Sequence, residues 1–492
     1  MSVRRHSTLN LIGTLLPIPV TLLTTPYYLH ALGTVRYGVL ALVWLLLGYF
    51  GVFDFGLGRA TAQRLAARPE ASRAEQAASL WTGVLLNLML GGLGGLVLYA
   101  TAAVLFDRVF QLDATLRSEV QLAAPWLILA VPVTTLAPVV TGALEARLRF
   151  RDLNIASALG SIAGQTVPLV IALTWSTSLT VLIPAVIVTR GVVVSALFLL
   201  CHRALLAGET ARLHREEIAP LLRFGGWVAL TGLATPLMAV MDRFIIGALL
   251  GAKEVTYYSV PLQIAERTGV LPNALTSALY PRLAGAAADD EARALALRAT
   301  ISLAAIMTPV MLLGVLLMRP FLVLWVGPEI AGHAARTGEI LMVGFWINAF
   351  ARIPLVLLQA RGHPDRVAKC HLAELLPYLG LLWIGIRAGG PQLAAVVFGL
   401  RVLFDWAILS AISSTLRGQL RPIALPAAQL AAAVLLVTLL PAPGRLRLLL
   451  AGLLTSVTLA WTWRIAPQDL RNLPRVFAES YFRSGGSPPG HS

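Results

Sequence analysis

Long apolar runs, separated by short polar breaks, recur along the whole chain. Residues 80–104, 122–144, 303–318 and 426–441 are almost or entirely free of charge. A helix needs about 20 apolar residues to cross roughly 30 Å of hydrocarbon, and flanking residues can extend a shorter run. The pattern therefore predicts an integral membrane protein that crosses the bilayer many times.

Counting the runs between polar breaks gives fourteen candidate spans. They fall at about 7–31, 37–62, 77–106, 120–144, 153–175, 180–202, 224–250, 255–281, 295–318, 336–360, 370–387, 393–416, 424–440 and 446–464. We expect an all-α fold in which two six-helix lobes form a repeat. The predicted parts are a first lobe (1–202), a cytoplasmic linker (203–223), a second lobe (224–416), two further helices (417–465) and a cytoplasmic tail (466–492).

The basic residues lie mostly in the short breaks. The hydrophobic fraction is 57%, and only 13% of residues are charged, yet the net charge is +15. With the N-terminus inside, about 25 Arg and Lys residues fall on the cytoplasmic side and about 9 on the other, as positively charged inner loops require. The distribution predicts a multi-pass membrane protein with both termini in the cytoplasm, and it argues against a nucleic-acid partner.

The sequence offers little for covalent chemistry. The two cysteines, Cys201 and Cys370, are predicted to be free thiols without zinc spacing, so neither a metal nor a cofactor is expected. No phosphate-binding loop of the nucleotide-hydrolysing type is present, and the longest outer loop, 107–119, is short. We expect a transport protein that is not an enzyme.

Two segments echo each other in the two halves. Residues 32–38 read LGTVRYG between the first two spans, and residues 250–258 read LGAKEVTYY between the seventh and eighth. Each reads as a helix stop at Leu-Gly, a short outer loop, and a Tyr that opens the next helix. Parallel repeats of six spans place the substrate path between the two halves.

Charged residues inside the spans carry the candidate chemistry. A central Arg costs about 2.5–3.5 kcal/mol on insertion scales, so such residues face the protein interior. Guanidinium groups match phosphate oxygens and keep their charge at any physiological pH. The candidate ligands for a phosphate-bearing substrate are Arg190, Arg243, Arg267 and Arg352. The acids that could carry a coupling ion or serve as counter-ions are Asp54, Asp242, Glu266 and Glu374.

Structural explanations compete at several of these positions. Arg401 and Asp405 are four residues apart on one helix face and are predicted to form a structural pair. Asp242 and Arg243 are adjacent and point about 100° apart, so one of them should reach another helix. Arg352 and Glu374 could instead snorkel or pair locally.

Several motifs resemble the Wzx-type oligosaccharide flippases of the polysaccharide transporter family, in the multidrug/oligosaccharidyl-lipid/polysaccharide exporter superfamily. They are YGVL at 37–40, DFGLGRA at 54–60, MDRFIIG at 241–247 and ALYPRL at 278–283. The resemblance implies transport of an undecaprenyl-pyrophosphate-linked oligosaccharide from the inner to the outer leaflet of the bacterial inner membrane, for O-antigen, capsule or exopolysaccharide. It implies membrane lipids as partners, and a polysaccharide polymerase and chain-length proteins as further candidates.

Two other functions fit the same pattern. One is a drug or metabolite exporter of the same superfamily, driven by protons or sodium. The other is a membrane protein of polysaccharide assembly that does not transport. Excess intramembrane Arg and the two additional spans favour the flippase, in which two lobes would rock around a central cationic cavity.

Overall fold

The structure, a computed structural model, describes residues 17–49, 54–68, 70–110, 112–147, 149–232, 234–440 and 445–465. In these ranges the chain is helical and has no strand. Ten of the described helices are long and apolar enough to cross a membrane. The predicted class, an all-α membrane protein, is confirmed. The predicted start of the first span and the predicted tail 466–492 lie outside the described residues.

The chain divides into two compact units. The first comprises residues 1–259 and 382–391, and the second comprises 260–381 and 392–492. The boundary at 259/260 falls later than the linker at 203–223, so the predicted repeat of two six-helix lobes stays a prediction.

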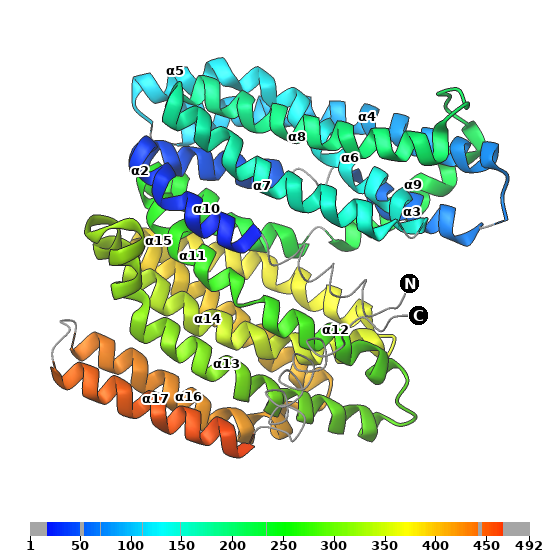
Figure 1. The fold of residues 1–492 in the computed structure, drawn as a ribbon. Helices are drawn as coiled ribbons and strands as arrows, with labels where there is room; N and C mark the ends of the chain where they lie inside the picture. The colour runs from blue at the N-terminus through cyan, green and yellow to red at the C-terminus, as the bar shows by residue number, and fades with distance from the viewer. Residues whose placement is uncertain are drawn as a thin grey trace, which may run out of the picture. The chain divides into compact units, whose positions relative to one another are not determined.

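Most helices of the first unit run along one another (Figure 1). They are α2 (Pro17–Tyr49), α3 (Leu57–Ala67), α4 (Arg73–Val104), α5 (Ala114–Ala123), α6 (Leu127–Ala146), α7 (Phe150–Thr174), α8 (Leu179–Cys201), α9 (Arg215–Gly232) and α10 (Ala234–Leu250), with short π-helical turns at Leu105–Val109 and His202–Leu206 and a 3₁₀ turn at Ala124–Trp126. Helix α6 packs against α3, α4 and α8, and a buried aliphatic cluster that includes Leu80, Val139 and Leu197 fills the space between them.

The second unit is built around one long helix. Its helices are α12 (Val270–Ala284), α13 (Asp289–Val326), α14 (Pro328–Ala360), α15 (Pro364–Ile412), α16 (Leu416–Leu439) and α17 (Arg445–Ile465). Residues 382–391 of α15 belong to the first unit, and α11 (Ala252–Arg267) has residues in both units. Helix α13 packs along α14, and α16 and α17 pack on α13. The last two predicted spans therefore lie at the side of this unit.

Predicted spans and observed helices differ where the backbone bends. Helix α2 contains a kink at Gly33 and holds parts of the first two predicted spans, the second of which continues into α3. Helix α15 contains a kink at Gly389 and Gly390 and holds the eleventh predicted span and most of the twelfth. The eighth predicted span is instead divided, because α11 ends at Arg267 and α12 begins at Val270.

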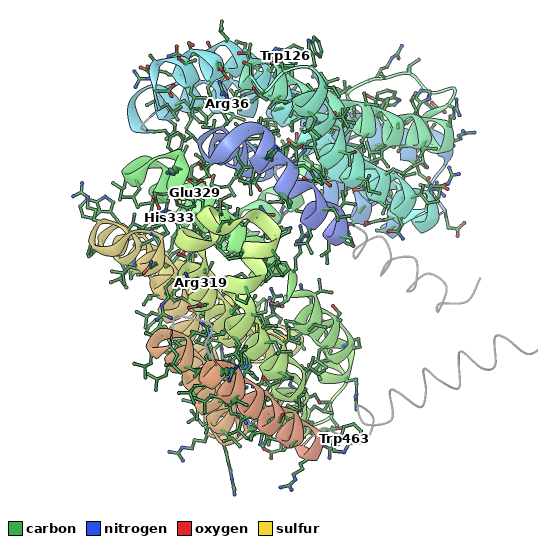
Figure 2. All side chains as sticks on the ribbon, turned by 60° about the vertical axis from the view of Figure 1, so that its left-hand side comes forward. Arg36, Trp126, Arg319, Glu329, His333 and Trp463 are labelled. Carbon is green, nitrogen blue, oxygen red and sulfur yellow. The ribbon has the colours of Figure 1, made fainter. Side chains whose placement is uncertain are left out.

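Large apolar side chains cover the outside of the helices (Figure 2). Leu324 is 88% exposed, Leu376 is 76% exposed, and Trp463 near the end of α17 is 63% exposed. A water-soluble protein would not carry so many apolar side chains on its surface. This apolar surface is suited to contact with the hydrocarbon of a lipid bilayer.

The two echoed Leu-Gly segments meet each other within the first unit. Gly33 and Gly251 have φ values of 69° and 89°, in the left-handed region that ends a helix at glycine. The Thr256 hydroxyl donates a hydrogen bond of 2.6 Å to the Thr34 carbonyl. A Cβ atom at Gly38 would collide with the carbonyl of Ala252. The helix stops that the repeat predicts thus place α2 and α11 in close backbone contact.

Gly38→Ala is expected to lower the free energy of unfolding by about 2 kcal/mol, as overpacking of a tight contact does. The matched control is Gly48→Ala in the same helix, where an added Cβ would meet nothing within 4 Å. Alanine there should be neutral or slightly stabilising, because glycine is the poorer helix former. Thermal unfolding of both purified variants measures the difference, and equal melting temperatures would contradict the close contact.

Candidate functional site

Arg190 lies in the middle of α8 and is half-buried. Among the residues that the structure describes, its guanidinium makes no hydrogen bond or ion pair. An intramembrane charge without a counter-ion is costly and is kept where it has a function. Of the four predicted phosphate ligands, Arg190 is therefore the candidate that the contacts of the described residues support best.

Arg352 on α14 has one neutral partner. Its Nη1 donates a hydrogen bond to Oδ1 of Asn273 on α12. An amide oxygen fixes the direction of the guanidinium without cancelling its charge. The sequence analysis missed Asn273, although an Asn within an apolar span was a signal that could have found it. Among the described residues Arg352 makes no ion pair, so a local pair does not account for it.

Asp242 reaches another helix. It is buried, and its Oδ2 accepts a hydrogen bond of 2.7 Å from the hydroxyl of Tyr258 on α11. Arg243 contacts its own helix, with Nε 3.4 Å from Asp242 Oδ1 and Nη2 donating to the Ala239 carbonyl at 2.6 Å. The Asp242 charge is thus already held, which favours a structural role for this acid.

Glu266 and Arg267 lie at the end of α11, where a tight turn at Thr268 and Gly269 joins it to α12. Glu266 is exposed and Arg267 is half-buried. A cation is favourable at a helix C-terminus, because the last carbonyl groups carry partial negative charge.

Asp54 lies three residues before α3 and not within it. Its Oδ1 accepts a hydrogen bond of 2.6 Å from the backbone N–H of Gly56. Gly56 has a φ of 68° and precedes the first residue of α3. The local role of Asp54 is to order the chain as it enters this helix.

Arg401 faces Glu374 across the hairpin of α15, not Asp405 as the spacing predicted. The Nε of Arg401 lies 3.6 Å from Oε2 of Glu374, and Oδ1 of Asp405 lies 3.3 Å from Nε2 of His371. Both carboxylates are buried. The expected pair is therefore replaced by two pairs that join the two arms of the hairpin, and Glu374 does not snorkel.

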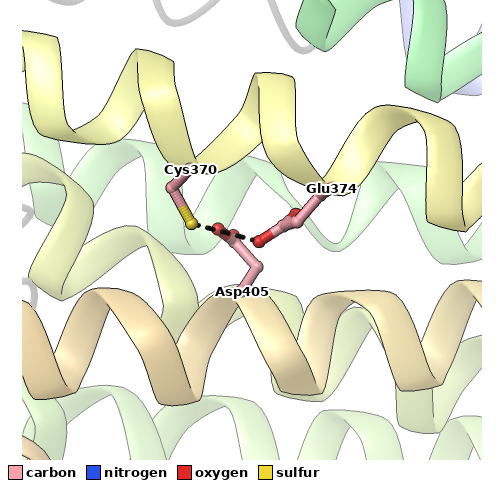
Figure 3. Close-up of side chains that lie close together, drawn as sticks. All are labelled: Cys370, Glu374 and Asp405. Atoms are coloured by element: carbon pink, nitrogen blue, oxygen red, sulfur yellow. Dashed lines mark hydrogen bonds between the residues drawn. The ribbon is translucent and has the colours of Figure 1, made fainter.

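Cys370 completes this cluster (Figure 3). Its thiol donates to Glu374 Oε1 at 3.2 Å, and one donor atom each from Cys370, Glu374 and Asp405 lies within 4.8 Å of the others. A thiol and two carboxylates could hold a divalent cation. The Arg401 guanidinium already supplies positive charge beside Glu374, which disfavours a divalent cation at this cluster.

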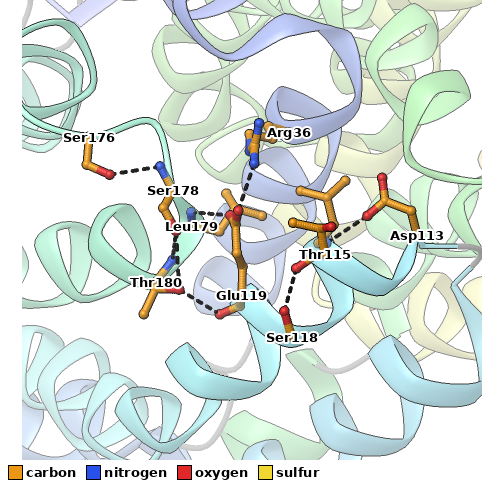
Figure 4. A network of polar contacts seen from close by, with 10 residues as sticks. Arg36, Asp113, Thr115, Ser118, Glu119, Ser176, Ser178, Leu179 and Thr180 are labelled. Atoms are coloured by element: carbon orange, nitrogen blue, oxygen red, sulfur yellow. Dashed lines mark hydrogen bonds and ion pairs between the residues drawn. The ribbon is translucent and has the colours of Figure 1, made fainter.

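Glu119 joins three helices of the first unit (Figure 4). Its Oε1 accepts from Arg36 Nη2 on α2 at 2.7 Å, and its Oε2 accepts from the backbone N–H of Leu179 at the start of α8 at 2.8 Å. An anion at a helix N-terminus satisfies N–H groups that have no partner within the helix. The sequence analysis treated both charges as outer-loop residues and missed this contact.

Glu217 makes a second three-helix contact, called here the Glu217 clamp. Arg64 on α3 donates two hydrogen bonds of 2.8 Å to its two carboxylate oxygens, and the Ser79 hydroxyl on α4 donates at 2.8 Å. Glu217 itself is at the start of α9 and is buried. The Arg64 guanidinium holds the pKa of Glu217 below its ordinary value.

Glu217→Gln is expected to lower the free energy of unfolding by about 2 kcal/mol at pH 7, the lower part of the range for a broken ion pair, because Arg64 is partly exposed. A lowered folded-state pKa contributes stability above the ordinary glutamate pKa of about 4.3. That contribution is lost as the pH falls through the lowered value. The difference in the free energy of unfolding between wild type and variant should therefore disappear in acid. Unfolding at a series of pH values measures this difference.

The neighbouring Glu216 is exposed and supplies the control. Glu216→Gln should leave the unfolding free energy within about 0.5 kcal/mol of wild type. A pH-independent difference for Glu217→Gln would show that the clamp does not act through the carboxylate charge.

The fold is that of a multi-span membrane transporter. The structure of the lipid II flippase MurJ superposes with a TM-score of 0.68 at 12% identity, covering 93% of this chain and 98% of that chain. An inward-facing multidrug MATE family transporter of the MOP superfamily superposes with a TM-score of 0.60 at 17% identity, covering 86% and 96%. At these identities the likeness defines the fold.

The family follows from the sequence match. The model of the family described as "Polysaccharide biosynthesis protein" matches residues 32–329, so the chain belongs to this family. A Shigella flexneri protein named "Putative O-antigen transporter" is 27% identical over 412 residues, which are 83% of this chain and 97% of that protein. The predicted resemblance to polysaccharide flippases is confirmed.

Proposed function

We propose that the protein moves an undecaprenyl-pyrophosphate-linked oligosaccharide across the bacterial inner membrane for surface polysaccharide biosynthesis. The family, the similarity to an O-antigen transporter and the flippase fold support transport of a polysaccharide precursor. In this proposal the protein carries out no covalent chemistry, and both termini lie in the cytoplasm.

The observation that carries the choice of cargo is the state of Arg190 and Arg352. Within the described residues neither side chain is paired with an acid. Each guanidinium therefore keeps its charge and its donors for a pyrophosphate, which is doubly or more negatively charged. Arg243 and Arg267 are proposed as further ligands of the same head group.

The proposal assigns the candidate acids to two different roles. Asp54 and Asp242 have local structural partners, whereas Glu374 and Asp405 sit beside a histidine and an arginine. Glu374 and Glu266 remain the candidates for ion coupling. The substrate path would lie between two rocking lobes, with the lipid tail left in the bilayer. A polysaccharide polymerase and chain-length proteins remain proposed partners.

A deletion strain tests the proposal. Lipid-linked repeat units are expected to accumulate at the cytoplasmic face, as probed with a membrane-impermeant glycosidase on vesicles of both orientations. Expression of the chain from a plasmid should return them to the outer leaflet and restore surface polysaccharide. Accumulation on the outer leaflet would instead indicate an assembly protein, and unchanged polysaccharide with a new drug sensitivity would indicate a drug exporter.

A further inference from the structure

A polar pocket lies in the second unit where three loops meet. The loops follow α12, α14 and α15, and the pocket has a volume of about 810 Å³, within the roughly 300–1,000 Å³ of small-molecule sites. The other large grooves described in this unit, on α14–α16, on the α15 hairpin and between α16 and α17, are lined mostly by apolar residues. The polar pocket therefore differs from these grooves in the chemistry of its lining.

Positive charge dominates the lining. Arg293, Arg361 and Arg366 face one carboxylate, Asp289, and His363 adds a further donor. Arg361 binds Asp289 through Nη2 and donates through Nη1 to the Ala286 carbonyl at 2.9 Å. The pocket therefore holds an excess of cations over anions.

Two of the basic groups are unengaged. In the part of the chain that the structure describes, the side chains of Arg366 and His363 make no hydrogen bond or ion pair. Arg293 is held by Asp290 at 2.6 Å, outside the lining. Arg366 and His363 both lie at the start of α15, one turn apart, so a single anion can contact both.

Hydroxyl groups also line the pocket. Ser413 and Ser414 follow the end of α15, and Ser414 has a φ of 58°. The Ser413 hydroxyl donates a hydrogen bond of 2.8 Å to the Leu409 carbonyl, so Ser414 supplies the hydroxyl that can donate to a ligand. A left-handed conformation at a residue other than glycine costs about 1 kcal/mol or more and is often retained at binding sites. A hydroxyl donor in the same pocket as guanidinium groups suits an oxyanion.

We propose that this pocket binds a phosphate group, presented either by an anionic lipid head group or by a soluble phosphate compound. Arg366 and His363 would contact the phosphate oxygens, Arg361 would add the donors that Asp289 leaves available, and the Ser414 hydroxyl would add a further donor. The predicted topology places the pocket at the cytoplasmic membrane surface, where both kinds of phosphate are present. The lining includes none of Arg190, Arg352 and Asn273.

Native mass spectrometry of the full-length protein in detergent tests this site with three probes: phosphatidylglycerol, the zwitterionic phosphatidylcholine, and inorganic pyrophosphate. The double variant Arg366→Gln with His363→Gln is expected to weaken binding of the preferred probe at least tenfold. Arg417→Gln is the matched control, because Arg417 is an exposed arginine on α16 that does not line the pocket.

The probes distinguish the two sources. Retention of phosphatidylglycerol that pyrophosphate does not displace identifies a lipid head group, and displacement by pyrophosphate identifies a soluble ligand. Equal binding of all probes, no binding of any, or an equal loss in the Arg417→Gln control would overturn the proposal. None of these measurements uses a lipid-linked glycan, so the result is independent of the export assay.

Discussion

Arg190→Gln is expected to reduce export of the lipid-linked glycan at least tenfold while leaving the protein folded and inserted. A hydrogen bond to a charged group is worth about 1.5–3 kcal/mol, and each 1.4 kcal/mol is a factor of ten in affinity. Since Arg190 makes no hydrogen bond or ion pair to the described residues, its removal breaks no such contact there. Surface polysaccharide in a complemented deletion strain measures export, and thermal unfolding measures the fold.

Two further variants serve as comparisons for Arg190→Gln. Arg190→Lys keeps the charge but loses the planar fork of donors, so it should retain part of the export. Arg203→Gln, at an exposed arginine just beyond α8, should export as wild type does. A melting temperature lowered in Arg190→Gln with export unchanged would identify Arg190 as a structural residue.

Arg401→Gln should have the largest effect on stability, a loss of about 3 kcal/mol in the free energy of unfolding. Removing one member of a buried ion pair leaves the other charge uncompensated and typically costs about 3–5 kcal/mol. Glu374 is the group left behind, with a side chain that is only 3% exposed. Unfolding in mixed micelles with increasing SDS measures the loss.

The double variant Glu374→Gln with Arg401→Gln tests whether the pair itself is responsible. Neutralising both groups removes the uncompensated charge, so much of the lost stability should return. If the two single losses simply add, Arg401 and Glu374 act independently, and the pairing seen in the hairpin is energetically unimportant.

The partners of buried charged residues could not be predicted from the sequence. The spacing of Arg401 and Asp405 predicts a pair along one helix, because residues four apart are neighbours on a helix surface. In the structure each side chain takes a partner from the other arm of the hairpin, Glu374 and His371 respectively. Local spacing carries no information about which side chains another segment brings close.

Asn273, Glu119 and Glu217 were missed for the same reason. Each is unremarkable among its sequence neighbours and gains its role from a residue at least 79 positions away: Arg352, Arg36 and Arg64. An Asn in an apolar span was the one local signal. The two glutamates lie outside the apolar runs, where a charge needs no explanation.

The sequence by itself determined the solvent and the class of this protein. The length of the apolar runs indicates a bilayer, since a spanning helix must match the thickness of the hydrocarbon. The position of the basic residues indicates it too, since Lys and Arg are concentrated in cytoplasmic loops. It also determined the helix stops at Gly33 and Gly251, because left-handed backbone is a local property of glycine. Only the tertiary structure decided which charges are compensated and which, such as Arg190, have no partner among the described residues. Compensation depends on a few ångströms between helices that are distant in sequence, and electrostatic energy at low dielectric changes steeply over that distance.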